Sequence, residues 1–196
     1  MVPGAIVLSG KLSDLWTIWQ LRRNLVILVI SLMSSSFCYF LINFQMKQFE
    51  GSLITNTLSS QIAELLADII SMFLYRRLGA KLAFSSMFMF SVVGAALLWI
   101  FHTQKGQRQN PVLLIFIFMS KFGVSSCFNS CYLGFVQLIP TLYSSSAFGY
   151  GNVVARTITI LAPLIAEKQH PYPLLAIIIM ASIAALASAF LITKMP

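Results

Sequence analysis

The sequence predicts an all-α membrane protein with six transmembrane helices, and two observations support this class. Hydrophobic residues make up 58% of the chain and charged residues only 9%, whereas a soluble domain carries about a quarter charged residues. A spanning helix needs about 20 mostly apolar residues, and six segments are this long: residues 25–44, 52–75, 82–101, 112–138, 144–166 and 173–192. Together they form a predicted bundle over residues 25–193, which leaves no room for a soluble catalytic domain.

Each segment is expected to be helical, because a backbone in lipid must satisfy its hydrogen bonds internally and no alternating strand pattern is present. Turn-forming residues separate the segments; they stand at Glu50-Gly51, Leu78-Gly79, His102–Pro111, Pro140-Thr141 and His170–Pro173. Residues 1–24 precede the first span. There, two tryptophans favour a short helix at the membrane surface, anchored by Arg22 and Arg23, with an irregular lead-in as the alternative.

The distribution of lysine and arginine predicts the orientation, because cytoplasmic loops carry an excess of these residues. One side receives seven of the 13: Lys11, Arg22, Arg23, Arg76, Arg77, Lys81 and Lys194. The other side receives four: Lys47, Lys105, Arg108 and Lys168. Both termini are therefore expected on the cytoplasmic or matrix side of a membrane whose organelle these residues do not identify.

Polar residues three or four positions apart form stripes along four of the segments, and such spacing keeps residues on one side of a helix. The second segment carries Thr57, Gln61, Glu64, Asp68, Ser71 and Tyr75. The fourth carries Lys121, Ser125, Asn129 and Tyr132, the fifth Asn152, Arg156 and Thr159, and the first Ser35, Tyr39 and Asn43. We expect these stripes to face a shared interior, while the third and sixth helices support the bundle. In the sixth, Ala181, Ala185 and Ala189 form a small-residue ridge suited to close helix contact.

Four ionisable residues fall inside the segments: Glu64, Asp68, Lys121 and Arg156. Each costs at least about 2.5 kcal/mol at membrane depth, so each requires an explanation. One interpretation is mutual ion pairing inside the bundle. The other is contact with a charged solute or a coupling proton, and the two are compatible.

Several functional classes find no support in the residues. No nucleophile–histidine–carboxylate order, phosphate loop or metal set predicts an enzyme or a cofactor, and no basic stripe with exposed aromatics predicts nucleic-acid binding. His102 and His170 are expected in solvated loops. Cys38, Cys127 and Cys131 are expected to be small buried packing residues rather than redox or metal ligands.

Several short motifs of the chain occur in the order and spacing of a known family. The loop between the second and third segments carries Arg76, Arg77, Gly79 and Lys81. The last third carries Lys121-Phe122-Gly123, Phe128-Asn129, Tyr132, Gln137-Leu138-Ile139-Pro140-Thr141, Gly149, Ala155-Arg156 and Ala162-Pro163. From about Leu12 to Pro196, the chain resembles the C-terminal half of an organic cation/anion transporter of the major facilitator superfamily.

The resemblance implies two inverted three-helix repeats, half of a major facilitator fold. It implies that the stripes form one wall of a solute path, with these residues facing the solute or a partner: Tyr39, Gln61, Glu64, Asp68, Lys121, Asn129, Tyr132, Asn152 and Arg156. Arg156 would occupy the cavity position of anion-carrying members, which favours a small organic anion. The family, however, has twelve helices, and Gln137, Ser144 and Ala80 replace charged residues of its cytoplasmic gate.

Two functions therefore stay open. The first is a non-transporting structural or accessory subunit of a larger membrane assembly, with other subunits or lipid covering the stripes. The second is organic-ion transport by alternating access, after pairing with a second six-helix half or by dimerising. The resemblance favours the plasma membrane, and the subunit interpretation is compatible with the mitochondrial inner membrane.

Overall fold

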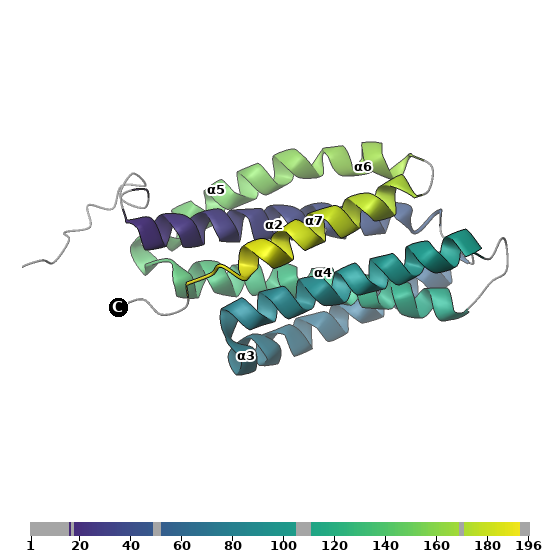
Figure 1. The fold of residues 1–196 in the computed structure, drawn as a ribbon, viewed down its shortest axis with the longest axis horizontal. Coiled ribbons are helices and arrows are strands. Elements are labelled where there is room, and N and C mark those ends of the chain that lie inside the picture. The colour runs from purple at the N-terminus through teal and green to yellow at the C-terminus, as the bar shows by residue number, and fades with distance from the viewer. Residues whose placement is uncertain (1–15, 17, 49–51, 105–110, 169–170, 193–196) are drawn as a thin grey trace, which may run out of the picture.

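The computed structural model describes residues 16, 18–48, 52–104, 111–168 and 171–192, and within them the chain folds into helices without any strand. The helices lie roughly along one axis and form an elongated bundle (Figure 1). They are α2 (Trp19–Gln45), α3 (Leu53–Gln104), α4 (Pro111–Leu138), α5 (Thr141–Thr159), α6 (Leu161–Ala166) and α7 (Tyr172–Ser188). The all-helical part of the predicted fold is thereby confirmed.

Four helical stretches among the described residues are long and apolar enough to cross a membrane: Trp19–Gln45, Leu53–Phe101, Val112–Leu138 and Thr141–Ala166. The apolar α7 is shorter, with 17 residues. Many large hydrophobic side chains point outward, among them Ile54, which is 78% exposed, and Leu65, which is 61% exposed. Extensive apolar surface of this kind is unusual on a soluble monomer and supports a membrane fold. Six crossings and the repeat arrangement remain predictions.

Gly79 interrupts α3 at the place where the sequence predicts a turn. Its φ of 75° and ψ of 163° lie outside the helical region, and glycine reaches this region without the steric penalty that a Cβ brings. Figure 1 shows the chain turning back within α3, so that the parts before and after the turn run in opposite directions. Each part, of about 25 residues, would be roughly 38 Å long at 1.5 Å per residue.

Some boundaries differ from the expected ones. Helix α2 begins at Trp19, so the last residues of the predicted 1–24 segment continue into the first span instead of forming a separate surface helix. No residue between Trp19 and Asn24 breaks a helix, which explains the continuity. Of the preceding residues, the structure describes only Trp16 and Ile18. His102 belongs to the end of α3 and not to a loop, while His170 lies outside the described residues.

The predicted fifth span is split into α5 and α6 at Ile160. Pro163 explains the break, because proline has no N–H to donate to the carbonyl of Thr159 four residues earlier. At the same residue, the Thr159 hydroxyl donates to the Ala155 carbonyl at 2.7 Å and lies 3.1 Å from the Ser36 hydroxyl of α2. The span also starts three residues earlier than predicted, at Thr141, since Pro140 stands immediately before the helix, outside its first turn.

Two hydrophobic clusters fill the bundle interior. One includes Leu28, Phe84 and Phe135, and the other includes Leu41, Val124 and Ile177. The predicted cysteine packing is confirmed, since Cys38, Cys127 and Cys131 are all buried. In α7, Ala181 and Ala185 are buried as the small-residue ridge requires.

The first part of α3 packs through a narrow stripe of small residues. Ser60, Ala63, Ala67 and Ser71 are buried, while large apolar neighbours face outward. This packing fixes the rotation of the helix about its axis. Of the predicted polar stripe, Ser71 and Tyr75 are buried and Glu64 is partly buried, but Thr57, Gln61 and Asp68 are exposed. These three residues are therefore not covered by the other helices of this chain, and whether they face a solute path or a partner stays a prediction.

Candidate functional site

Lys121 is the centre of a cluster of charged and polar side chains from three helices. Its side chain, on α4, is fully buried, and its ammonium lies 3.5 Å from a carboxylate oxygen of Glu64 on α3. It also donates a 2.8 Å hydrogen bond to the amide oxygen of Asn43 on α2. The ammonium lies 3.3 Å from the centre of the Tyr39 ring, within the range of a cation–π contact. Two predicted stripe residues, Glu64 and Lys121, thus form an ion pair.

Tyr39 completes this cluster from α2. Its hydroxyl donates a 2.7 Å hydrogen bond to the other carboxylate oxygen of Glu64. Glu64 therefore accepts a hydrogen bond from α2 and pairs with a cation from α4. These contacts join three helices at one point. An ionic group that is taken out of water is tolerated when charges and hydrogen bonds surround it in this way.

Asp68 lies one turn after Glu64 but outside this ion pair. Its carboxylate accepts a hydrogen bond from the Asn129 side-chain amide of α4, and its side chain is exposed. The structure gives it no basic partner among the described residues. Mutual pairing of all four ionisable residues is thus not what the fold provides.

Arg156 is exposed on α5. Its guanidinium carbon lies 5.4 Å from the centre of the Phe40 ring of α2, and no carboxylate in the described part of the chain pairs with it. Asn152, one turn earlier, uses its amide locally, donating to the Phe148 carbonyl at 3.1 Å.

A row of aromatic rings connects these residues. Tyr39 stacks on Phe128 with ring centres 5.9 Å apart, Phe128 meets Tyr132 at 5.3 Å, and Tyr132 meets Phe148 of α5 at 4.9 Å. Tyr39 also contacts Phe40 at 5.4 Å, which leads to Arg156. We call the resulting group of side chains the polar–aromatic face; it comprises Tyr39, Phe40, Glu64, Asp68, Phe128, Asn129, Tyr132, Phe148 and Arg156, together with the fully buried Lys121.

The sequence pattern alone missed Phe40 and Phe148 as members of this face. A phenylalanine in an apolar segment is equally compatible with a lipid contact, so its type carries no signal of position. Phe128 could have been found, because it stands four residues before Tyr132 and one before Asn129. Gln61 is exposed and has no contact with the other members that the structure records.

The predicted loop motif divides into two groups. Gly79, Lys81 and Gln137 line one cavity of about 440 Å³ between the turn in α3 and the end of α4. Arg76, Arg77, Pro140, Thr141 and Gly149 do not line it. Ser144, in place of a charged residue of the family, donates to the Phe135 carbonyl at 3.0 Å, so this position ties α5 to α4 without charge.

Comparison with known proteins gives a weak relationship to transporters. No protein-family profile matches the chain. The chain is 23% identical over 159 residues to organic cation/carnitine transporter 2 of Homo sapiens, an alignment that covers 79% of this chain and 27% of the relative. The chain therefore spans about a quarter of the length of that protein. Together with the long apolar helices, this similarity points to an integral membrane protein with a transporter-like relationship.

Proposed function

We propose that the chain is a six-helix transporter half whose polar–aromatic face forms one wall of a path for a small organic anion. In this proposal α3 crosses the membrane twice, on either side of Gly79, and α7 forms the last crossing. The other wall comes from a second six-helix half or a second copy of the chain. Solute would pass by alternating access at the interface between the halves.

The observation that carries the proposal is a charged and aromatic surface on the outside of an otherwise apolar bundle. Asp68, Tyr132 and Arg156 are all exposed, on helices whose neighbouring faces are large and hydrophobic. Charged side chains facing hydrocarbon are costly. The face is therefore better explained as the lining of a water-filled space, or as the contact with a partner, than as a lipid surface.

Arg156 is the group of this face that favours an anion. Glu64 neutralises Lys121 within the chain, whereas Asp68 keeps its negative charge and accepts a hydrogen bond from the neutral amide of Asn129. Arg156 is the exposed cation, held beside an aromatic ring that could stack on an organic solute. A guanidinium binds carboxylates through paired hydrogen bonds.

Uptake by proteoliposomes tests the proposal. The purified protein, with any co-purifying partner, should accumulate a radiolabelled aromatic carboxylate above the level of protein-free vesicles. Arg156→Ala should reduce this uptake about tenfold, as expected for the loss of a charge-assisted hydrogen bond, and should leave unfolding free energy within about 0.5 kcal/mol of wild type. Lys168→Ala removes an exposed cation elsewhere and should change neither. Equal uptake by wild type and Arg156→Ala would contradict the assignment of Arg156.

A second candidate is a non-transporting accessory subunit in a larger membrane assembly. Ala80, Gln137 and Ser144 favour it, because the family gate to which the chain is similar uses charged residues at these positions. Here the polar–aromatic face would contact partner helices. Sizing after gentle solubilisation, combined with the uptake assay, distinguishes the two: a stoichiometric complex far above 21.8 kDa without uptake activity supports the subunit, whereas a complex that accumulates the solute argues against it.

A further inference from the structure

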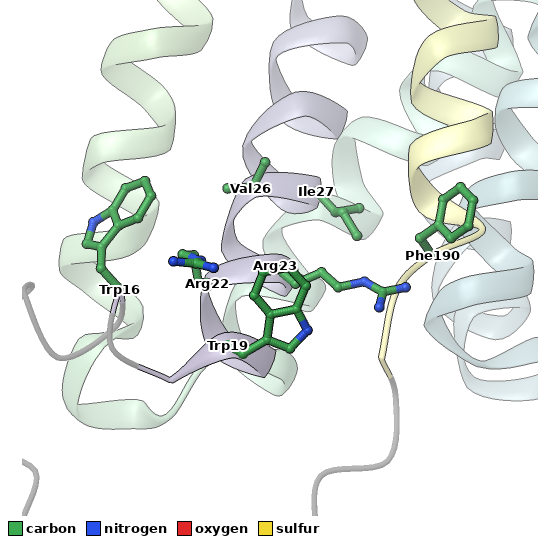
Figure 2. Close-up of a pocket in the computed structure, with 7 residues that line it drawn as sticks. All are labelled: Trp16, Trp19, Arg22, Arg23, Val26, Ile27 and Phe190. Atoms are coloured by element: carbon green, nitrogen blue, oxygen red, sulfur yellow. The ribbon is translucent and has the colours of Figure 1, made fainter.

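The first turns of α2 and the residue Phe190, just after α7, line an open pocket that shares no residue with the polar–aromatic face. Its volume is about 700 Å³, and it is lined by Trp16, Trp19, Arg22, Arg23, Val26, Ile27 and Phe190 (Figure 2). The lining combines two cations with aromatic and aliphatic side chains. None of these residues contributes to the function proposed above.

The two arginines are held by aromatic rings rather than by carboxylates. The Arg22 guanidinium lies 4.8 Å from the centre of the Trp19 ring, and the Arg23 guanidinium lies 5.8 Å from that of Phe190. Figure 2 shows the Arg23 side chain extending toward Phe190. Among the described residues, no carboxylate lies within ion-pair distance of either. With respect to the described part of the chain, both guanidinium groups therefore keep their donors available for an anion.

The local backbone adds to this positive potential. Helix α2 begins here without a capping side chain and without an acidic residue in its first turn. The unpaired N–H groups of a helix start carry partial positive charge. Arg22 and Arg23 thus reinforce the end of a helix dipole instead of opposing an existing acid.

The opposite wall of the cavity is fixed by a reciprocal hydrogen-bonded pair. The Asn24 side-chain amide donates to the Ile192 carbonyl at 2.9 Å, and the Ile192 N–H donates to the Asn24 side-chain oxygen at 3.0 Å. Asn24 is fully buried. These two bonds join the start of α2 to the chain that follows α7, and they hold Phe190 near Arg23.

An apolar path continues from the arginines along α2. Val26 and Ile27 extend the cavity one turn deeper. Trp16 and Val26 also line a second, smaller cavity with Val29, Tyr150 and Val154, on the side of α5. A cationic entrance above two adjoining apolar grooves matches the shape of a diacyl lipid with a negatively charged headgroup. Basic pockets between helices at the cytoplasmic side of membranes bind such lipids.

We propose that this cavity is a binding site for an anionic phospholipid, with the phosphate at Arg22 and Arg23 and the acyl chains along α2. Trp16 and Trp19 would lie at headgroup level, where tryptophan is enriched. The proposal does not depend on transport, because it requires only that the bundle is inserted in a membrane.

Tryptophan quenching by brominated lipids tests the site, since two of the three tryptophans line it. A Trp99→Phe variant is reconstituted in phosphatidylcholine vesicles that contain a minor fraction of brominated phosphatidylglycerol or, in parallel, brominated phosphatidylcholine. We expect an apparent preference of about 25-fold for the anionic lipid, given a factor of about five for each of the two arginines near the surface. Equal quenching by the two lipids would overturn the proposal.

Charge variants made in the Trp99→Phe background test whether Arg22 and Arg23 cause the preference for the anionic lipid. Arg22→Gln/Arg23→Gln should abolish the preference while quenching by phosphatidylcholine stays at the reference level, which also shows that the variant is inserted. Arg76→Gln/Arg77→Gln removes two exposed cations elsewhere and should keep it; a loss in this control would reveal general surface attraction and refute the site. If the first variant fails to insert, Phe190→Ala replaces it, and an unchanged preference there would likewise refute the site.

Discussion

Lys121 and Glu64 illustrate how single residues determine the behaviour of this bundle. The lysine is completely buried and balanced by one carboxylate, one amide oxygen and one aromatic ring. Removing either member of such a pair leaves the other charged group without its partner, while removing both does not. The stability of the chain should therefore depend on the pair as a unit.

This dependence predicts a strongly non-additive double-mutant cycle. Glu64→Gln alone should lower the free energy of unfolding by about 3 kcal/mol, because it leaves a buried ammonium unneutralised. Lys121→Met should cost less, since Glu64 is partly exposed. The double variant should recover at least about 1 kcal/mol relative to the sum of the single losses. Unfolding by sodium dodecyl sulfate in mixed micelles measures these values, and an additive cycle would contradict the pairing.

The periodicity of the sequence predicted much of this residue-scale picture. The spacing of Glu64, Lys121 and Tyr39 placed each on a polar stripe, and these three residues meet. The spacing could not give the direction of each stripe. That direction depends on which side of α3 packs, and the small residues Ser60, Ala63 and Ala67 decide it. Likewise, only tertiary packing could bring Phe40 beside Arg156.

At the scale of helices, close contact between α3 and α4 depends on glycine. A Cβ on Gly123 would lie 2.7 Å from both the Met87 carbonyl oxygen and the Ser91 nitrogen. On the other helix, a Cβ on Gly94 would lie 2.6 Å from the Ser120 nitrogen. The two helices thus approach at backbone distance, as small-residue interfaces in membranes allow.

Two glycine-to-alanine substitutions should separate the effect of this close contact on stability from the effect of alanine's higher helix propensity. Gly123→Ala should destabilise the protein by about 1–3 kcal/mol through overpacking against backbone atoms. Gly149→Ala is the matched control, because nothing lies within 4 Å of its Cβ position, and it should be neutral or stabilising by up to about 1 kcal/mol. Thermal unfolding in detergent compares them; the same sign for both variants would exclude the packing explanation.

Gly79 allows a different test, since its surroundings are open and only its backbone is unusual. Gly79→Ala should cost about 1–3 kcal/mol, because this combination of φ and ψ is essentially restricted to glycine. Gly79→Asn should cost about as much, because a ψ of 163° lies outside the left-handed helical region that asparagine tolerates. Unfolding measurements on both variants suffice, and an undiminished stability of Gly79→Ala would show that the turn relaxes to another conformation.

For the whole molecule, the proposed six crossings would place the turn at Gly79 on the same side as the start of α2. Single cysteines introduced at Arg77 and Lys81 should then react with an impermeant maleimide from one side of sealed vesicles, and cysteines at Lys47 and Lys168 from the other. All four positions are exposed. Labelling of all four from one side would exclude this topology and, with it, the arrangement proposed for the solute path.

The bond pair between Asn24 and Ile192 has a consequence for chain connectivity. Because the first and last helices of the described bundle meet where α2 begins and α7 ends, a short linker could join these points, and new ends could be opened at another loop. Such a circular permutation should fold, since the order in which the helices are synthesised would change while their neighbours stay the same.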